Sequence, residues 1–155
     1  MTTKKPPRPK RTPEPIIKFA SIEEARASLR EWQVRLFLDD WVIDIKLEDE
    51  IIVDADGKRL SGQINFQIIN KTAKIALSPL SPLSPEGEEY IFRHSQEQAI
   101  VHELLHCKIG WLDPPETMEG RHWDVCQHVL IEEMARSLIM AKYNITRGWF
   151  DNTGR

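Results

Sequence analysis

The segment His102-Glu103-Leu104-Leu105-His106 carries the residues whose types and spacing point most directly to chemistry. Residues four positions apart lie on one face of a helix, so His102 and His106 can present two imidazoles to one metal ion. Zinc is the usual ion for such a pair. Glu103 is expected beside the open position of the metal, where its carboxylate can take a proton from a zinc-bound water. The segment therefore predicts a hydrolytic zinc site with Glu103 as the general base.

A catalytic zinc needs a third protein ligand and an open fourth position, and three sources are available. Asp113 is one residue too late for the metzincin pattern, in which a His or Asp follows the second histidine by six residues. Glu132 and Glu133 lie on a later predicted helix, where adjacent residues face about 100° apart, so only one is expected to reach the metal. His128, four residues before Glu132, and His122 form the third source. Spacing alone leaves these alternatives open.

The elements that must position these residues follow from the periodicity of apolar residues. A helix is predicted from Ser21, which with Glu24 resembles a capping box, to about Asp39. Alternating or short apolar runs then predict four strands, at residues 41–47, 51–53, 64–69 and 73–77. A turn is predicted at residues 54–57, directly after the second strand. A mainly antiparallel sheet is the expected result.

The second half of the chain has a helical pattern. One helix is predicted from Ser95 to a stop at Gly110, and it carries both histidines of the motif. A break at Asp113-Pro114-Pro115 precedes a last helix from about Arg121 to Tyr143, with Asn144 as its end. The order of helix, small sheet and two further helices predicts an α+β fold.

Residues 1–15 hold five prolines among five basic residues and cannot bury an apolar face. They predict a disordered or polyproline-like tail, and residues 16–155 a single folded domain. The charge of the tail could attract nucleic acid, although a solubilising tail is the simpler interpretation. The proline-rich segment 78–85 is predicted to be a loop, since proline recurs at every third residue.

Composition limits the class of protein. The net charge of −3 and pI near 6.0 argue against nucleic-acid binding by the whole surface. No apolar run is long enough to span a bilayer, and the basic N-terminus lacks the apolar region of a secretory signal. Two cysteines are too few for a disulfide scaffold and are typical of reduced thiols. These features predict a cytoplasmic protein without a membrane partner.

Taken together, these motifs resemble zincins of the gluzincin type, and more narrowly the small metallopeptidases of phages and prophages that are related to the ImmA/IrrE-type peptidases. The resemblance covers residues 37–143. It rests on the strand that opens at Asp40-Trp41, on the stretch from Ile100 to His106, and on the helix from Ile131 to Leu138. It implies a minimal zincin-like domain in which an active-site helix is followed by a C-terminal helix that carries a ligand. For a phage protein, the compartment would be the cytoplasm of the host cell.

The resemblance also implies roles for residues outside the central motif. In that group the last helix has a Glu followed three residues later by Ala and then by a large apolar residue, and Glu132 fits this frame better than Glu133. It therefore implies one Zn²⁺ held by His102, His106 and Glu132. The family fold further implies a substrate-binding edge strand just before the active-site helix, which corresponds to residues 73–77. The oxyanion-stabilising residue is undefined, with Tyr143, His128 and Arg136 as candidates.

The expected function is zinc-dependent hydrolysis of a protein or peptide substrate. The alternative is a catalytically silent metal-binding module with the zincin shape, which acts through protein or nucleic-acid interaction. Glu103 favours the enzyme, because a purely structural zinc site normally fills all four positions and needs no general base.

Overall fold

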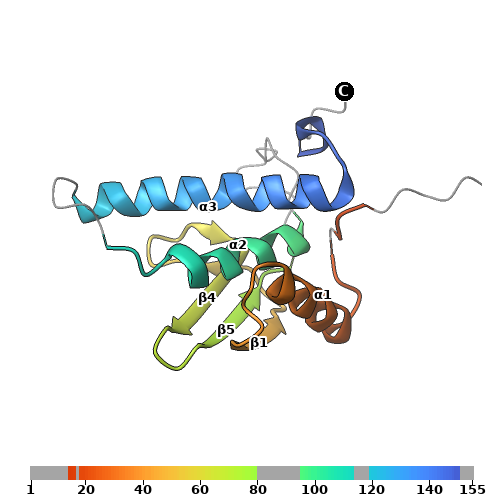
Figure 1. Ribbon diagram of the computed structural model, residues 1–155, viewed down its shortest axis with the longest axis horizontal. Helices are drawn as coiled ribbons and strands as arrows, with labels where there is room; N and C mark the ends of the chain where they lie inside the picture. Colours follow the sequence, from red (N-terminus) through yellow and green to blue (C-terminus); the bar gives the residue numbers. More distant parts are fainter. Residues whose placement is uncertain (1–13, 17, 80–94, 114–118, 151–155) are drawn as a thin grey trace, which may run out of the picture.

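The computed structural model describes residues 14–16, 18–79, 95–113 and 119–150 (Figure 1). Its secondary structure confirms the α+β prediction, since helices flank a small set of short strands. The elements are α1 (Ile22–Arg35), β1 (Val42–Leu47), β2 (Ile52–Val53), β3 (Arg59–Leu60), β4 (Gly62–Gln67), β5 (Thr72–Leu77), α2 (Gln96–Ile109), α3 (Gly120–Tyr143) and the 3-10 turn η1 (Arg147–Phe150). Most of the tail and most of the proline-rich loop lie outside the described residues.

The main sheet has the strand order β1-β5-β4. β5 pairs with β1 in parallel and with β4 antiparallel, while β2 and β3 form a separate antiparallel ribbon. The expectation that residues 73–77 form a free edge is therefore wrong, because β5 is the central strand and is bonded on both sides. The edge strand on the β4 side is β4 itself. Sequence order misled here because β1 and β5 pair directly, although β2, β3 and β4 lie between them in the sequence.

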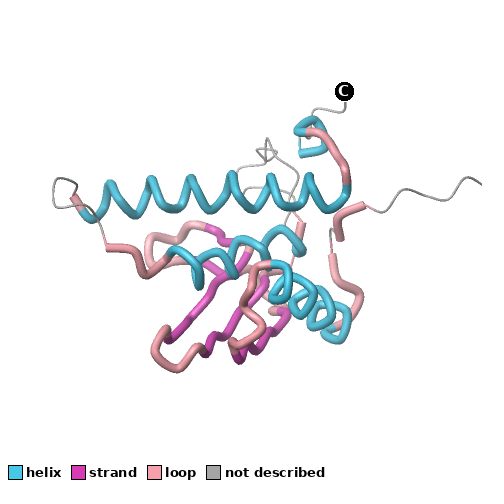
Figure 2. Tube along the Cα trace, viewed as in Figure 1, coloured by secondary structure: helices cyan, strands magenta, loops and turns pink. Residues whose placement is uncertain are grey.

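The helices lie on one side of this sheet in two layers (Figures 1 and 2). α1 and α2 pack on the strands, and α3 runs across α2, so α2 lies between the sheet and α3. This position explains why α2 is buried on nearly all sides, including the polar side chains of Gln96, Glu97, Gln98, His102 and Glu103. A helix buried all round needs partners for its polar groups. Those of Glu97 and Gln98 come from α1, α3 and Ile16, and those of Gln96 are the N–H of Phe19 and the carbonyl of Ser78.

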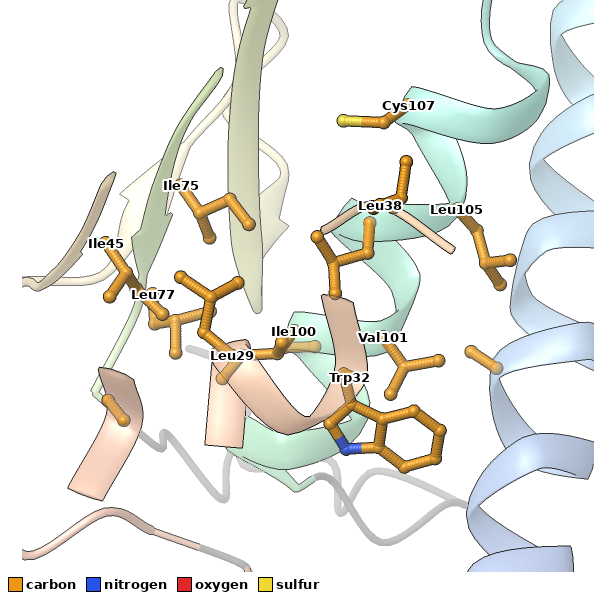
Figure 3. Close-up of a cluster of buried hydrophobic side chains, with 14 of the residues drawn as sticks. Leu29, Trp32, Leu38, Ile45, Ile75, Leu77, Ile100, Val101, Leu105 and Cys107 are labelled. Carbon is orange, nitrogen blue, oxygen red and sulfur yellow. The ribbon is translucent and has the colours of Figure 1, made fainter. Parts of the chain in front are cut away.

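The apolar core fills the space between α1, the sheet and α2 (Figure 3). In Figure 3, Leu29 of α1 lies beside Leu77 of the central strand and Ile100 of α2, while Trp32 of α1 lies on the side of Val101; Ile75 belongs to the same buried cluster. Each of these side chains is at most 3% exposed, and burial of such a side chain contributes about 1.5–3 kcal/mol relative to exposure. The core thereby fixes one face of α2 against the sheet and leaves the other face to α3.

The ends of the helices are set by local hydrogen bonds. Ser21 caps α1, since its Oγ accepts the N–H of Glu24 at 3.2 Å, but the carboxylate of Glu24 accepts the N–H of Ala20 at 2.6 Å and not that of Ser21. Ser95 caps α2 in the same way, with its Oγ 3.1 Å from the N–H of Gln98. α3 ends at Asn144, which adopts a left-handed conformation with φ of 51°.

Glu97 of α2 connects four segments of the chain through hydrogen bonds of its side chain. Its side chain is fully buried and accepts hydrogen bonds from Trp32 Nε1 at 2.9 Å, Lys142 Nζ at 2.7 Å, Tyr143 OH at 2.6 Å and the N–H of Ile16 at 3.0 Å. Breaking a buried ion pair by removing one partner costs about 3–5 kcal/mol. Glu97 thus links α1, α3 and the segment before α1 to the helix that carries the histidine motif.

Candidate metal centre

Three histidines from two helices converge on one point. His102 and His106 lie one turn apart on α2, and His128 reaches them from α3. One ring nitrogen from each lies within 4.8 Å of the other two, and the ring centroids are 4.7–5.9 Å apart. Three nitrogens around one zinc ion lie about 3.3 Å apart, so small movements of the side chains would close the group on an ion. These residues lie close enough to bind a metal ion, and three imidazoles suit a divalent transition metal.

Glu132, the third metal ligand that the resemblance implies, contacts the ring of His102. Its Oε2 is 2.9 Å from His102 Nδ1, and its Oε1 accepts from Gln98 Nε2 and from Arg136, each at 2.9 Å. Although burial raises the pKa of Glu132, the hydrogen bond from His102 and the charges of His102 and Arg136 hold it below its usual value. The ionised carboxylate can only accept, so His102 Nδ1 donates and Nε2 is left for a metal.

The structure thus places His128 beside His102 and His106, and it places Glu132 against the Nδ1 side of His102. A carboxylate that accepts from the second nitrogen of a ligating histidine is a common feature of zinc sites, where it fixes the ring and raises its basicity. Ligation by Glu132 stays a prediction. Among the described residues, the ligand atoms that lie mutually close belong to His102, His106 and His128. This proximity favours His128 as the third ligand.

The other candidates from the sequence lie elsewhere. Asp113 and His122 are exposed and lie outside the histidine group. The side chain of Glu133 is 57% exposed and faces Arg136, 3.5 Å away. Of the proposed oxyanion donors, Tyr143 donates to the buried Glu97. Burial, the bond to Glu97 and its charge together raise the pKa of Tyr143 to about 12, so its hydroxyl is committed to that contact.

Glu103 lies beside the histidine group in a confined position. The residue is 5% exposed, and burial raises the pKa of its carboxyl to about 7, with the charge of Glu132 adding to the rise and His102 opposing it. A carboxyl in that range can take up and return a proton near neutral pH. Its Oε1 lies against Gly62 of β4, where a Cβ atom would be only 3.0 Å away. A glycine at this point of β4 makes room for the carboxylate.

The pKa values of two of the imidazoles, those of His106 and His128, are lowered. Burial lowers the pKa of His106 to about 4, helped by the charges of His102 and His128, and it lowers the pKa of His128 together with the charges of His102 and Lys58. Metal ligation requires an unprotonated ring nitrogen. His106 and His128 therefore hold the lone pairs that a metal needs at neutral pH.

The three histidines and Glu103 line one cavity of about 520 Å³. Its walls come from the β2–β3 ribbon with Lys58 and Arg59, from β4, from the first three turns of α2 and from His128 and Glu132 of α3. This volume is in the range of sites that bind small molecules or a few residues of a peptide. The cavity therefore joins the metal-binding group, a carboxyl able to exchange a proton, and room for a ligand.

Comparisons with protein-family models, with curated proteins and with solved structures found no match. In the described part of the chain, none of the helices has the length and apolar character needed to cross a membrane.

The edge strand β4 offers a second feature along the same cavity. The N–H of Ser78 donates to the carbonyl of Ser61, and the β4–β5 register continues from that pair. Since hydrogen-bonded and non-bonded pairs alternate in an antiparallel ladder, the backbone groups of Gly62, Ile64 and Phe66 point away from β5. All three residues line the cavity, and no described strand pairs with this edge.

Proposed function

We propose that this protein is a zinc-dependent metallopeptidase whose metal is held by His102, His106 and His128. The observation that carries the proposal is the convergence of these three imidazoles with the buried carboxyl of Glu103 in one cavity. Three protein ligands leave a fourth position open, which is typical of catalytic zinc sites and not of structural ones. The proposal keeps the zincin resemblance of the His-Glu-x-x-His segment, with His128 in the ligand position that the resemblance gives to Glu132.

A bound zinc ion would supply a Lewis acid that polarises the scissile carbonyl and acidifies a water molecule. Glu103 would take the proton of the attacking water and return it to the nitrogen of the leaving amine. Glu132 would hold the ring of His102 through Nδ1, supported by Gln98 and Arg136. The buried position of Glu103 favours this enzyme over a silent binding module, because a module has no use for a proton acceptor beside its metal.

A peptide substrate would lie along β4. The outward N–H and C=O groups of Gly62, Ile64 and Phe66 can pair with an extended chain by strand addition, which uses main-chain bonds and so accepts many sequences. The cavity between this edge and α3 would take the side chains next to the cleaved bond. A main-chain edge beside a metal site supports a peptide substrate over a small-molecule ester or amide.

Zinc is expected to be required for hydrolysis. Protein stripped with a chelator and then reloaded with one equivalent of zinc should cleave a proteome-derived peptide library, detected by labelling of new N-termini. The stripped protein should produce only background termini, because Glu103 alone cannot polarise the carbonyl. A fully zinc-loaded protein that yields no new termini would instead support the silent binding module.

A methyl group at Gly62 is expected to slow hydrolysis without removing the metal. In Gly62→Ala the new Cβ would lie 3.0 Å from Glu103 Oε1 and 3.3 Å from the carbonyl of Ala76, so the carboxylate must shift by a few tenths of an ångström. Because small misplacements of a reacting group are costly, kcat should fall about tenfold with unchanged zinc content. Gly120→Ala, where the added Cβ meets nothing within 4 Å, is the matched control. Equal losses in both variants would argue against a specific role for the contact.

A further inference from the structure

The β2–β3 ribbon brings positive charge to the cavity that holds the histidine group. Lys58, which directly precedes β3, and Arg59, its first residue, both line this cavity. Lys58 is exposed, and in the described part of the chain it forms no ion pair. Its charge contributes to the lowered pKa of His128 on α3, so the ammonium group lies within electrostatic range of the histidine group. A cation in this position attracts an anionic group of a bound ligand.

The main chain at Lys58 is held by a tight turn. The Oδ1 atom of Asp54 accepts the N–H of Asp56 at 2.9 Å and that of Lys58 at 2.8 Å. The N–H of Asp54 donates to the carbonyl of Lys58 at 2.9 Å, and Gly57 between them adopts a φ of 80°, which glycine tolerates best. The turn therefore fixes the point from which the side chain of Lys58 extends.

The ribbon is anchored to the rest of the domain by Ser78, which directly follows β5. Ser78 is 4% exposed, and its Oγ accepts the N–H of Ile52 at 2.9 Å and donates to the carbonyl of Leu60 at 2.6 Å. Its own carbonyl accepts Nε2 of Gln96, the first residue of α2, at 3.0 Å. One residue thus joins both strands of the ribbon to the helix that carries His102 and His106, which gives the ribbon a defined place beside them.

We propose that the ammonium group of Lys58 binds a carboxylate of the peptide substrate near the scissile bond, so that the enzyme selects substrates with an acidic group at one position. β4 begins at Gly62, shortly after Lys58 in the chain, so a peptide paired with β4 would pass close to this lysine. Hydrogen bonds from an ammonium to a carboxylate are among the stronger ones in proteins. The carboxylate is either an Asp or Glu side chain or the C-terminus of the peptide. This assignment rests on the proposed peptidase function and names its substrate class.

The first test uses the zinc-loaded wild-type protein and the same proteome-derived peptide library. Cleavage sites should be enriched in Asp or Glu at one position, or should lie at one fixed distance from the C-terminus of the peptide. For one cleaved peptide, replacing that acid with its amide should raise KM about fivefold at low salt if a side chain is bound, and amidation of the C-terminus should do so if the terminus is bound. Either difference should shrink at about 1 M salt, because exposed charges are then screened.

The second test changes the charge of Lys58. Lys58→Gln should raise KM for the acidic peptide about fivefold and leave KM for the amide peptide unchanged. Lys58→Glu should reverse the preference toward Lys or Arg at the same position, which the positive charge of zinc cannot produce. Arg30→Glu, on the exposed face of α1 and outside the cavity, gives the same change of net charge and should keep the wild-type preference.

The outcomes separate this assignment from the proposed function. Cleavage by the wild-type protein without an acidic preference, or a Lys58→Glu variant that keeps the preference, would overturn the role of Lys58 and leave the peptidase intact. A zinc-loaded protein that cleaves nothing but retains acidic library peptides, with retention lost in Lys58→Glu, would overturn hydrolysis and keep the carboxylate site. A protein that neither cleaves nor retains any library peptide would overturn both. The amide series on the wild-type protein decides the role of Lys58 if a variant fails to fold.

Discussion

Replacing Glu103 with Gln is expected to reduce kcat by about 10²–10⁴-fold while one zinc ion stays bound. The amide has the size of the carboxylate but cannot take the proton of the attacking water. Because Glu103 is only 5% exposed, a neutral side chain of equal size removes the cost of burying a charge, and the melting temperature should not fall. Turnover of a peptide taken from the library screen, zinc content by mass spectrometry and thermal unfolding measure these three quantities.

The control for this variant is Glu133→Gln. Glu133 is also an acid on α3, next to Glu132 in the sequence, but its side chain is 57% exposed and lies outside the histidine group. Its replacement should therefore change kcat less than about twofold. Hydrolysis by Glu103→Gln at the wild-type rate would contradict the role of Glu103 as the proton acceptor, even if the protein proved to be a peptidase.

Replacing His128 with Ala is expected to abolish stable zinc binding, whereas Glu132→Ala should keep one zinc ion. Loss of one of three ligands removes a direct bond to the metal, while loss of an outer carboxylate that holds a ligating histidine typically weakens metal binding about 10–100-fold. Titration of each metal-free variant with zinc against a competing chelator gives the affinities. Glu132→Ala should also lower kcat, because the ring of His102 loses its fixed orientation.

The opposite pattern would restore the ligand set implied by the family resemblance. If Glu132→Ala loses zinc and His128→Ala keeps it, the metal is held by His102, His106 and Glu132. Rotation of the Glu132 side chain toward the ion would then have to break its bonds to Gln98 and Arg136. A structure with zinc bound would show directly which side chain lies at ligand distance.

Some parts of the site depend on local geometry and were predictable from the sequence. His102 and His106 share a helix face because four residues make about one turn, and Glu103 is adjacent to that face. The ends of the helix follow from Ser95, whose hydroxyl accepts a main-chain N–H, and from Gly110. The position of Asn144 at the end of the last helix follows from its tolerance of a left-handed conformation.

The third ligand could not be chosen from spacing. His128 and Glu132 lie on the same stripe of α3, so the periodicity of the helix makes both available. Which of them meets His102 and His106 depends on how far α3 slides along α2 and on its rotation, and these are set by packing of residues such as Ile131, Ala135 and Ile139 on α2. The residue pattern within α3 does not predict its position and rotation relative to α2.

The sequence by itself determined the spacing of His102, Glu103 and His106 and the helix that carries them, because both depend on contacts within a few residues. Only the tertiary structure decided that His128 joins the histidines, that Glu132 orients His102, and that β4 is the edge beside the cavity. The physical reason is the same in all three cases. Helix offset and strand order arise from pairing between segments far apart in the chain, where burial and hydrogen bonding of the whole domain select one arrangement among several that the local pattern permits.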